Sequence, residues 1–165
     1  MAEIEDNLPE VYLQPGESYL ARSPTIIRTV LGSCVAASFW CSKLGIGALC
    51  HAQLPRSPKK SPAPLTVAEG RRFVDFAIRD LAKQFDDLGA PRKDVQVKLF
   101  GGGDVLLVSE QALSRPTVGK MNCESAREVL RDEGFSIYAS SLGGYCGLNI
   151  RFNTGTGEVL LRRLA

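Results

Sequence analysis

Two neighbouring apolar runs give the clearest structural signal in this chain. Residues 34–41 (CVAASFWC) and 44–51 (LGIGALCH) flank a polar dipeptide at positions 42–43, a pattern typical of a β-hairpin. Symmetric pairing around that dipeptide places Cys34 directly opposite His51. Directly opposed residues have Cβ atoms roughly 4.5–5.5 Å apart, so the pattern predicts a thiol beside an imidazole.

The turn of this hairpin leaves its register open. Ser-Lys is not a favoured two-residue hairpin turn, and Gly45 is compatible with a longer one. A register change of one residue would put Cys34 and His51 on opposite faces of the hairpin.

The pattern from Thr66 to Gly89 predicts an amphipathic helix. Thr66 and Glu69 have the spacing of a capping box, and Gly89 is a typical C-terminal stop. The apolar positions that recur on one face are Val74, Ile78, Leu81, Phe85 and Leu88. A second helix is predicted over residues 122–132, with Asn122 as its N-cap.

The remaining pattern predicts short strands and turns. The predicted strands cover residues 11–14, 18–21, 25–31, 95–100, 135–141, 148–152 and 158–162, and the last two form a closing hairpin. Prolines make 54–64 a loop. We expect a flexible N-terminal tail over 1–9 and one domain over 10–165. The order of elements predicts an α+β layered fold with a mixed, largely antiparallel β-sheet and two main helices.

Composition narrows the function classes. The net charge of the 165 residues is only +2, which gives no reason to expect a nucleic acid or a membrane surface as partner. No apolar run reaches about 18 residues, so we expect no membrane insertion. The odd number of cysteines, five, and the acidic N-terminus predict reduced thiols in the cytoplasm. Cys41, Cys50 and Cys123 are expected to be small buried apolar residues.

The Cys34–His51 pair is the candidate chemistry. An imidazole can take the thiol proton, and the thiolate can then attack a carbonyl while the imidazolium protonates the leaving amine. Gly32 permits a tight turn before Cys34, so backbone amides near Gly32 and Ser33 could form an oxyanion hole. The third group that orients such a base could be Thr29, Ser33 or Gln53.

A structural histidine and a zinc site compete with a catalytic pair at these positions. A lone histidine is more often a structural residue, and spacing alone does not establish an active site. A zinc site built from Cys34, Cys41, Cys50 and His51 lacks the usual ligand spacing.

The glycine-rich stretch Gly101–Asp104 could be mistaken for a phosphate loop. It lacks the GK[ST] that such a loop requires. A turn that ends a strand is the better interpretation.

The segment TVLGSCVA at 29–36 is followed by His51 and Leu54-Pro55. Further along the chain come KLFGGG at 98–103, VGKMN at 118–122, LGG at 142–144 and TGEV at 156–159. Together these segments resemble the CheD family, the chemoreceptor glutamine deamidases of bacterial chemotaxis, over roughly residues 10–163.

The resemblance implies hydrolysis of receptor glutamine amides to glutamate, with no metal and no organic cofactor. The family's nucleophile falls on Cys34 and its base on His51. Its third catalytic residue is a threonine shortly before LGSC, and Thr29 is the nearest match. Thr29 stands five residues before Cys34, while Arg28 occupies the position six before it, where some members have the threonine.

The family's fold is a layered α/β sandwich related to toxin deamidases. Its partners are chemoreceptor cytoplasmic domains and a CheC-type phosphatase. The alternative function is therefore an adaptor that binds receptors or such a phosphatase with little or no deamidase activity. Met121, Asp104 and Gly147-Leu148 depart from the family pattern, which bears on partner contacts more than on the chemistry.

Overall fold

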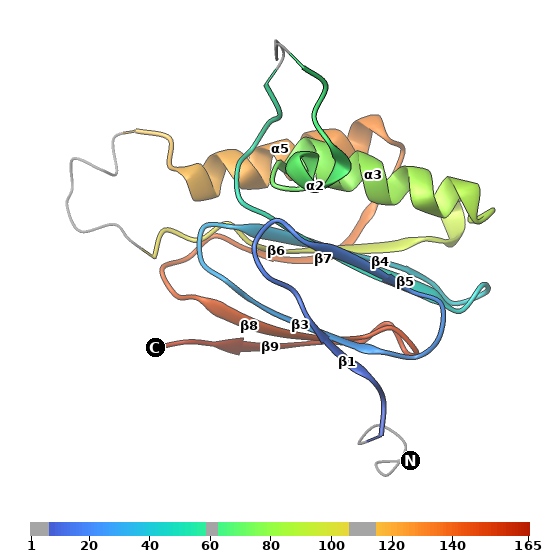
Figure 1. Ribbon diagram of the computed structural model, residues 1–165. Coiled ribbons are helices and arrows are strands. Elements are labelled where there is room, and N and C mark those ends of the chain that lie inside the picture. Colours follow the sequence, from blue (N-terminus) through green and yellow to red (C-terminus); the bar gives the residue numbers. More distant parts are fainter. Residues whose placement is uncertain (1–6, 59–62, 106–114) are drawn as a thin grey trace.

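Three layers build the molecule. The computed structural model describes residues 7–58, 63–105 and 115–165. A four-stranded outer sheet lies against a five-stranded middle sheet, and helices cover the other face of the middle sheet (Figure 1). The predicted α+β layered fold is confirmed. Its strands divide between two sheets, which the sequence pattern did not predict.

The outer sheet has the strand order β1-β3-β8-β9. β1 pairs in parallel with β3, while β3–β8 and β8–β9 are antiparallel. The strands are β1 Glu10–Tyr12, β3 Ile26–Leu31, β8 Leu148–Asn153 and β9 Val159–Arg163. The predicted closing hairpin is therefore confirmed as β8–β9.

The middle sheet has the strand order β2-β5-β4-β6-β7. Only β6–β7 is parallel among its pairings within the described residues. The strands are β2 Ser18–Ala21, β4 Val35–Cys41, β5 Ile46–Ala52, β6 Gln96–Gly101 and β7 Ile137–Leu142. The mixed, largely antiparallel character predicted from the sequence is confirmed.

The first predicted helix is divided in two. Thr66 forms the expected capping box with Glu69, but α2 (Val67–Gly70) ends before α3 (Val74–Asp87) begins. The carbonyl of Arg72 accepts hydrogen bonds from Gln53 N and Leu54 N at 2.8 and 3.1 Å. These contacts bind the segment between the two helices to the residues that follow β5. The prediction of a single helix over this stretch was therefore wrong.

The second long helix starts earlier than predicted. α5 (Val118–Asp132) has Thr117 as its N-cap, whose hydroxyl oxygen accepts from Lys120 N at 3.1 Å. Asn122 lies inside the helix, and its side chain bonds to other segments. α3 and α5 are the two main helices, and the 3-10 helix η1 (Arg92–Asp94) follows α3. No helix in the described residues is long and apolar enough to span a membrane.

The predicted N-terminal tail and proline-rich loop are only partly described. Residues 1–6 and 59–62 lie outside the described part of the chain. Pro9, which the prediction placed in the tail, accepts a hydrogen bond from Ile26 N at 2.8 Å through its carbonyl. The outer sheet thus holds the last residue of the expected tail.

Alternate residues of β4 and β5 serve two separate cores. On the helix side, Phe39 makes edge-to-face contacts with Phe85 and Phe135, with ring centroids 5.6 and 5.0 Å apart. The opposite face of β4 and β5 packs between the two sheets. The three cysteines expected to be buried lie in the helix-side core, so that prediction is confirmed for Cys41, Cys50 and Cys123.

The hairpin register differs from the prediction by two residues. Ala36, not Cys34, is opposite His51, and Cys41 is opposite Ile46. The connection is a four-residue turn over 42–45, in which Gly45 adopts a left-handed φ of 65°. An even shift preserves the face, so Cys34, which directly precedes β4 and lies two residues before Ala36, stays on the same side of the sheet as His51.

A glycine turn after β6 packs directly on the segment before β4. Gly102 N donates to Cys34 O at 2.8 Å, and Gly103 N donates to Gly32 O at 3.0 Å. A Cβ on Gly101 would lie 2.2 Å from Cys34 O. This turn is therefore part of the support of the Cys34 segment rather than a phosphate loop.

Replacing Gly102 by alanine should destabilise the fold. Gly102 has a φ of +63°, and an added Cβ would lie 2.1 Å from Cys123 Sγ and 2.9 Å from Gly119 O. We expect Gly102→Ala to lose about 1–3 kcal/mol in urea unfolding. Gly143→Ala is the matched control, because Gly143 has a φ of +81° and no atom within 4 Å of its added Cβ. Equal losses in the two variants would contradict the close packing.

Candidate active site

Cys34 lies where the chain crosses between the two sheets. Residues 32–34 connect β3 of the outer sheet to β4 of the middle sheet. The Cys34 side chain is half-buried and packs against the core between the sheets. His51 bonds to Thr29 of the outer sheet, so Cys34 and His51 both lie on the side of the middle sheet that faces the outer sheet. No hydrogen bond joins the thiol to the imidazole among the described residues.

His51 contacts Thr29 across the gap between the sheets. Thr29 Oγ1 lies 2.6 Å from His51 Nδ1, and the exposed fractions of the two residues are 0% and 1%. Thr29 belongs to β3 and His51 to β5, so the hydrogen bond joins the two layers. Buried polar groups are costly without partners, and this contact satisfies one ring nitrogen.

The hydrogen-bond chain fixes the tautomer of the histidine. Thr29 Oγ1 donates its single proton to Leu13 O at 2.9 Å. The hydroxyl must therefore accept from His51, which requires the proton on Nδ1. His51 Nε2 is then the unprotonated nitrogen, and it is buried without a hydrogen-bond partner among the described residues. This nitrogen is available to take a proton.

Burial keeps both reactive groups neutral at rest. Desolvation lowers the pKa of His51 to about 4, with only a smaller opposing effect from the Glu17 carboxylate. Desolvation also raises the pKa of the Cys34 thiol, partly offset by that residue's own backbone N–H. A neutral imidazole can act as a general base, so the arrangement is compatible with proton transfer from a thiol.

The structure brings together Thr29 and His51 but not the other candidates for the third group. The carbonyl oxygens of Ser33 and Gln53 accept hydrogen bonds from Asn122, while their side chains form no hydrogen bond with His51 in the described part of the chain. Arg28, which precedes Thr29 on β3, is exposed and forms an ion pair with Glu10. Alternation along β3 thus turns Thr29, and not Arg28, toward the histidine.

Sequence reasoning missed three groups that hold this site. The carbonyl of Leu13 could not be identified, because it depends on which strand lies beside β3. Gly102 and Gly103 were interpreted only as the end of a strand. Asn122 was predicted to be an N-cap, although the VGKMN segment that contains it carried part of the family resemblance.

A small cavity lies beside the Cys34 segment. It has a volume of about 220 Å³, and Ser33 forms part of its wall. The rest of the wall comes from the glycine turn and the start of α5, namely Gly103, Asp104, Val105, Thr117, Val118 and Gly119. Since Ser33 is the neighbour of Cys34, this cavity adjoins the segment that carries the thiol.

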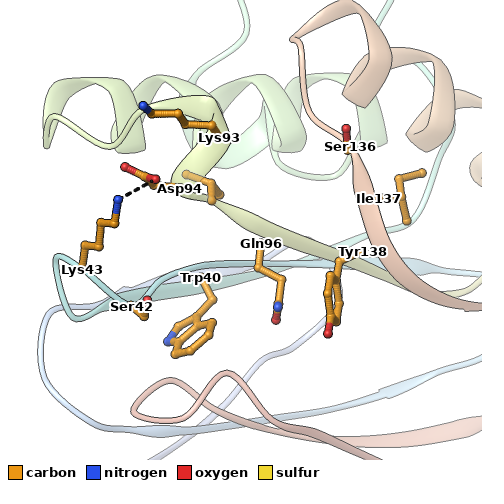
Figure 2. A pocket seen from close by; sticks show the side chains of 10 residues that line it. Trp40, Ser42, Lys43, Lys93, Asp94, Gln96, Ser136, Ile137 and Tyr138 are labelled. Carbon is orange, nitrogen blue, oxygen red and sulfur yellow. Dashed lines mark hydrogen bonds and ion pairs between the residues drawn. The ribbon is translucent and has the colours of Figure 1, made fainter.

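A larger hollow lies at the other end of β4. It has a volume of about 600 Å³, and Lys43 pairs with Asp94 at 3.0 Å beside it. Figure 2 shows the side chains that line it, among them Trp40 and Tyr138. Trp40 is near the end of β4, whereas Cys34 precedes its start. At about 3.3 Å per residue the two positions are roughly 20 Å apart, so this hollow is not part of the Cys34–His51 site.

The four residues considered for zinc do not gather. Cys41 and Cys50 lie in the helix-side core, while His51 faces the gap between the sheets. Among residues 7–58, 63–105 and 115–165 there is no group of three or more His, Cys, Asp or Glu side chains that could hold a metal ion.

Fold and site together define a layered α+β protein with a thiol and a threonine-bound imidazole between its sheets. The family model described as CheD chemotactic sensory transduction matches residues 53–163. This chain belongs to the CheD family.

Curated relatives match over most of the chain. A Geobacter sulfurreducens protein named probable chemoreceptor glutamine deamidase CheD 2 is 42% identical over 95% of this chain and 91% of its own. Relatives named probable chemoreceptor glutamine deamidase CheD occur in Maridesulfovibrio salexigens and Oleidesulfovibrio alaskensis. They are 34% and 38% identical, covering 99% and 95% of this chain and 97% and 74% of their own.

The depressed pKa of His51 should make the fold less stable in acid. Between about pH 6.5, where an unfolded histidine titrates, and the folded pKa of about 4, the unfolded state binds one more proton. Stability should therefore fall as pH falls, by up to about 1.4 kcal/mol per pH unit from this group.

Urea unfolding of the wild type and of His51→Gln between pH 7 and pH 4 tests this expectation. The glutamine cannot titrate, so the unfolding free energy of the wild type should fall more steeply with falling pH than that of the variant. Parallel pH profiles would contradict the depressed pKa.

Proposed function

We propose that this protein hydrolyses specific glutamine side chains of chemoreceptor cytoplasmic domains to glutamate, releasing ammonia. The names of the CheD relatives support this substrate. The observation that carries the chemistry is the buried His51 ring, whose Nδ1 is bound by Thr29 while Nε2 has no partner among the described residues. An unsatisfied buried nitrogen costs about 1–3 kcal/mol, which a purely structural histidine would not need to carry.

The first half of the proposed reaction forms a thioester. His51 Nε2 takes the proton from the Cys34 thiol as the sulfur attacks the carboxamide carbon of the glutamine. The imidazolium then gives this proton to the departing nitrogen, and the C–N bond breaks to release ammonia. Thr29 keeps the ring oriented throughout, because its hydroxyl oxygen accepts from Nδ1 in both protonation states.

The second half regenerates the thiol. His51 Nε2 accepts a proton from water, which attacks the thioester carbonyl carbon. The C–S bond breaks, the sulfur regains the proton, and the product is a glutamate side chain. Water is the only co-reactant, so the proposed reaction needs neither a metal nor an organic cofactor.

The backbone around Gly32 and Ser33 is our proposed oxyanion support. The carbonyls of Gly32 and Ser33 accept hydrogen bonds from Gly103 N and Asn122 Nδ2. In a planar trans peptide the N–H points away from the carbonyl. The N–H groups of Ser33 and Cys34 are therefore held in fixed directions, as a preorganised oxyanion site requires.

The competing function is a binding module for receptors or for a CheC-type phosphatase. Such an adaptor would work in the same cytoplasmic setting but would not depend on the thiol. The two functions are separated by a variant without the thiol: a deamidase would lose ammonia release but still bind receptors, whereas an adaptor would lose nothing.

Cys34→Ala should abolish deamidation and leave the fold intact. Peptide mass spectrometry of receptor cytoplasmic domains should show a shift of about +1 Da at specific glutamines with the wild type and none with the variant. Cys146→Ala is the matched control, because Cys146 is also a free cysteine and is exposed at the surface. Turnover by Cys34→Ala would contradict the thiol mechanism, and no turnover by the wild type on any receptor would favour the adaptor.

Thr29→Val should slow the reaction because it removes the hydroxyl that orients His51 while keeping the side-chain volume. We expect kcat to fall by about tenfold or more, by analogy with other misoriented catalytic bases. Thr29→Ser keeps the hydroxyl and should retain most of the activity. Equal rates for the valine and serine variants would show that Thr29 does not act through this hydrogen bond.

A further inference from the structure

Asn122 joins the two segments that carry the thiol and the imidazole. The residue is fully buried on α5, with an exposed fraction of 0%. Its Nδ2 donates to Ser33 O at 2.9 Å and to Gln53 O at 3.1 Å. Ser33 immediately precedes Cys34, and Gln53 follows His51 by two residues. One amide group thus spans both sides of the site.

The chemistry of the contacts fixes which way this amide faces. Both neighbours are backbone carbonyls, which can only accept, so the NH₂ group must point at them. Asn122 Oδ1 is left buried without a hydrogen-bond partner in the described part of the chain. Leaving a buried acceptor unpaired costs stability. The contribution of Asn122 to the structure therefore lies in the two hydrogen bonds that its NH₂ group donates.

Three successive peptide groups around Cys34 are held by fixed donors. Gly103 N donates to Gly32 O, Asn122 Nδ2 to Ser33 O, and Gly102 N to Cys34 O. Two of the donors are backbone groups of the glycine turn, and the middle donor is a side chain. The middle peptide carries the N–H of Cys34, which partly offsets the rise that burial causes in the pKa of the thiol. Of these three donors, Asn122 is therefore the one that a side-chain substitution can remove.

We propose that Asn122 is a positioning residue for the reaction. Its bond to Ser33 O holds the plane of the Ser33–Cys34 peptide and so directs the Cys34 N–H toward the sulfur and the developing oxyanion. Its bond to Gln53 O connects this segment to the end of the strand that carries His51. The expected loss of kcat rests on the proposed deamidase function. The effect of Asn122 on the thiol itself does not depend on any substrate.

Ser125 provides a matched comparison on the same helix. It lies three residues after Asn122, is also buried, and its hydroxyl donates to Pro55 O at 2.5 Å. It therefore makes the same kind of contact between α5 and the chain after β5. Its hydroxyl does not bond to the Cys34 segment. If these hydrogen bonds only stabilise the fold, removing the one from Ser125 should have the same effect as removing those from Asn122.

The test compares Asn122→Ala and Ser125→Ala in the full chain. The first readout is the pH profile of iodoacetamide alkylation at Cys34, followed by peptide mass spectrometry. The second is kcat and KM for receptor deamidation. Asn122→Ala should shift the alkylation midpoint to higher pH and lower kcat by about tenfold to a hundredfold with little change in KM. Ser125→Ala should do neither. Asn122→Leu keeps a similar branched shape without adding a charge, and it replaces the alanine variant if that variant does not fold.

The outcomes separate this inference from the proposed function. A folded Asn122 variant with wild-type kcat and alkylation profile overturns the positioning role, as does an equal loss in Ser125→Ala. If the wild type deamidates no receptor, the proposed function fails, and the alkylation profiles alone decide whether Asn122 positions the thiol.

Discussion

The hydrogen bond between Thr29 and His51 is the contact on which the site depends. It crosses between the two sheets, because Thr29 lies on β3 and His51 on β5. The bond is also directional: Thr29 donates to Leu13 O and must accept from Nδ1. The strand arrangement of the outer sheet therefore determines which nitrogen of a histidine in the middle sheet is free to accept a proton.

The thiol side of the site is built by close backbone packing more than by side chains. Gly102 and Gly103 donate to the carbonyls on either side of the Ser33–Cys34 peptide. Side chains at Gly101 or Gly102 would collide with Cys34 O or Cys123. The glycines of this turn thus let the end of β6 approach the crossover segment and hold it rigid, which a reaction that depends on orientation requires.

Local pattern was enough to predict that Cys34 and His51 share one face. The predicted face is correct although the register was wrong by two residues, because an even shift leaves each side chain on the same face of the strand. The error came from the turn, where the left-handed conformation of Gly45 lengthens the connection. The choice of Thr29 over Gln53 could not be made locally, since it depends on non-local pairing of β3. Asn122 fits an N-cap by residue type, but tertiary contacts use its amide and Thr117 caps the helix instead.

The position of the proton on the His51 ring is the measurement to make first. His51 is the only histidine in the chain, so its two ring nitrogens can be assigned without ambiguity in a long-range ¹H–¹⁵N correlation spectrum at neutral pH. We predict a neutral ring with the proton on Nδ1 and a bare Nε2. A neutral ring with the proton on Nε2, or a protonated ring at pH 7, would contradict the hydrogen-bond chain from Leu13 through Thr29 and remove the proposed base.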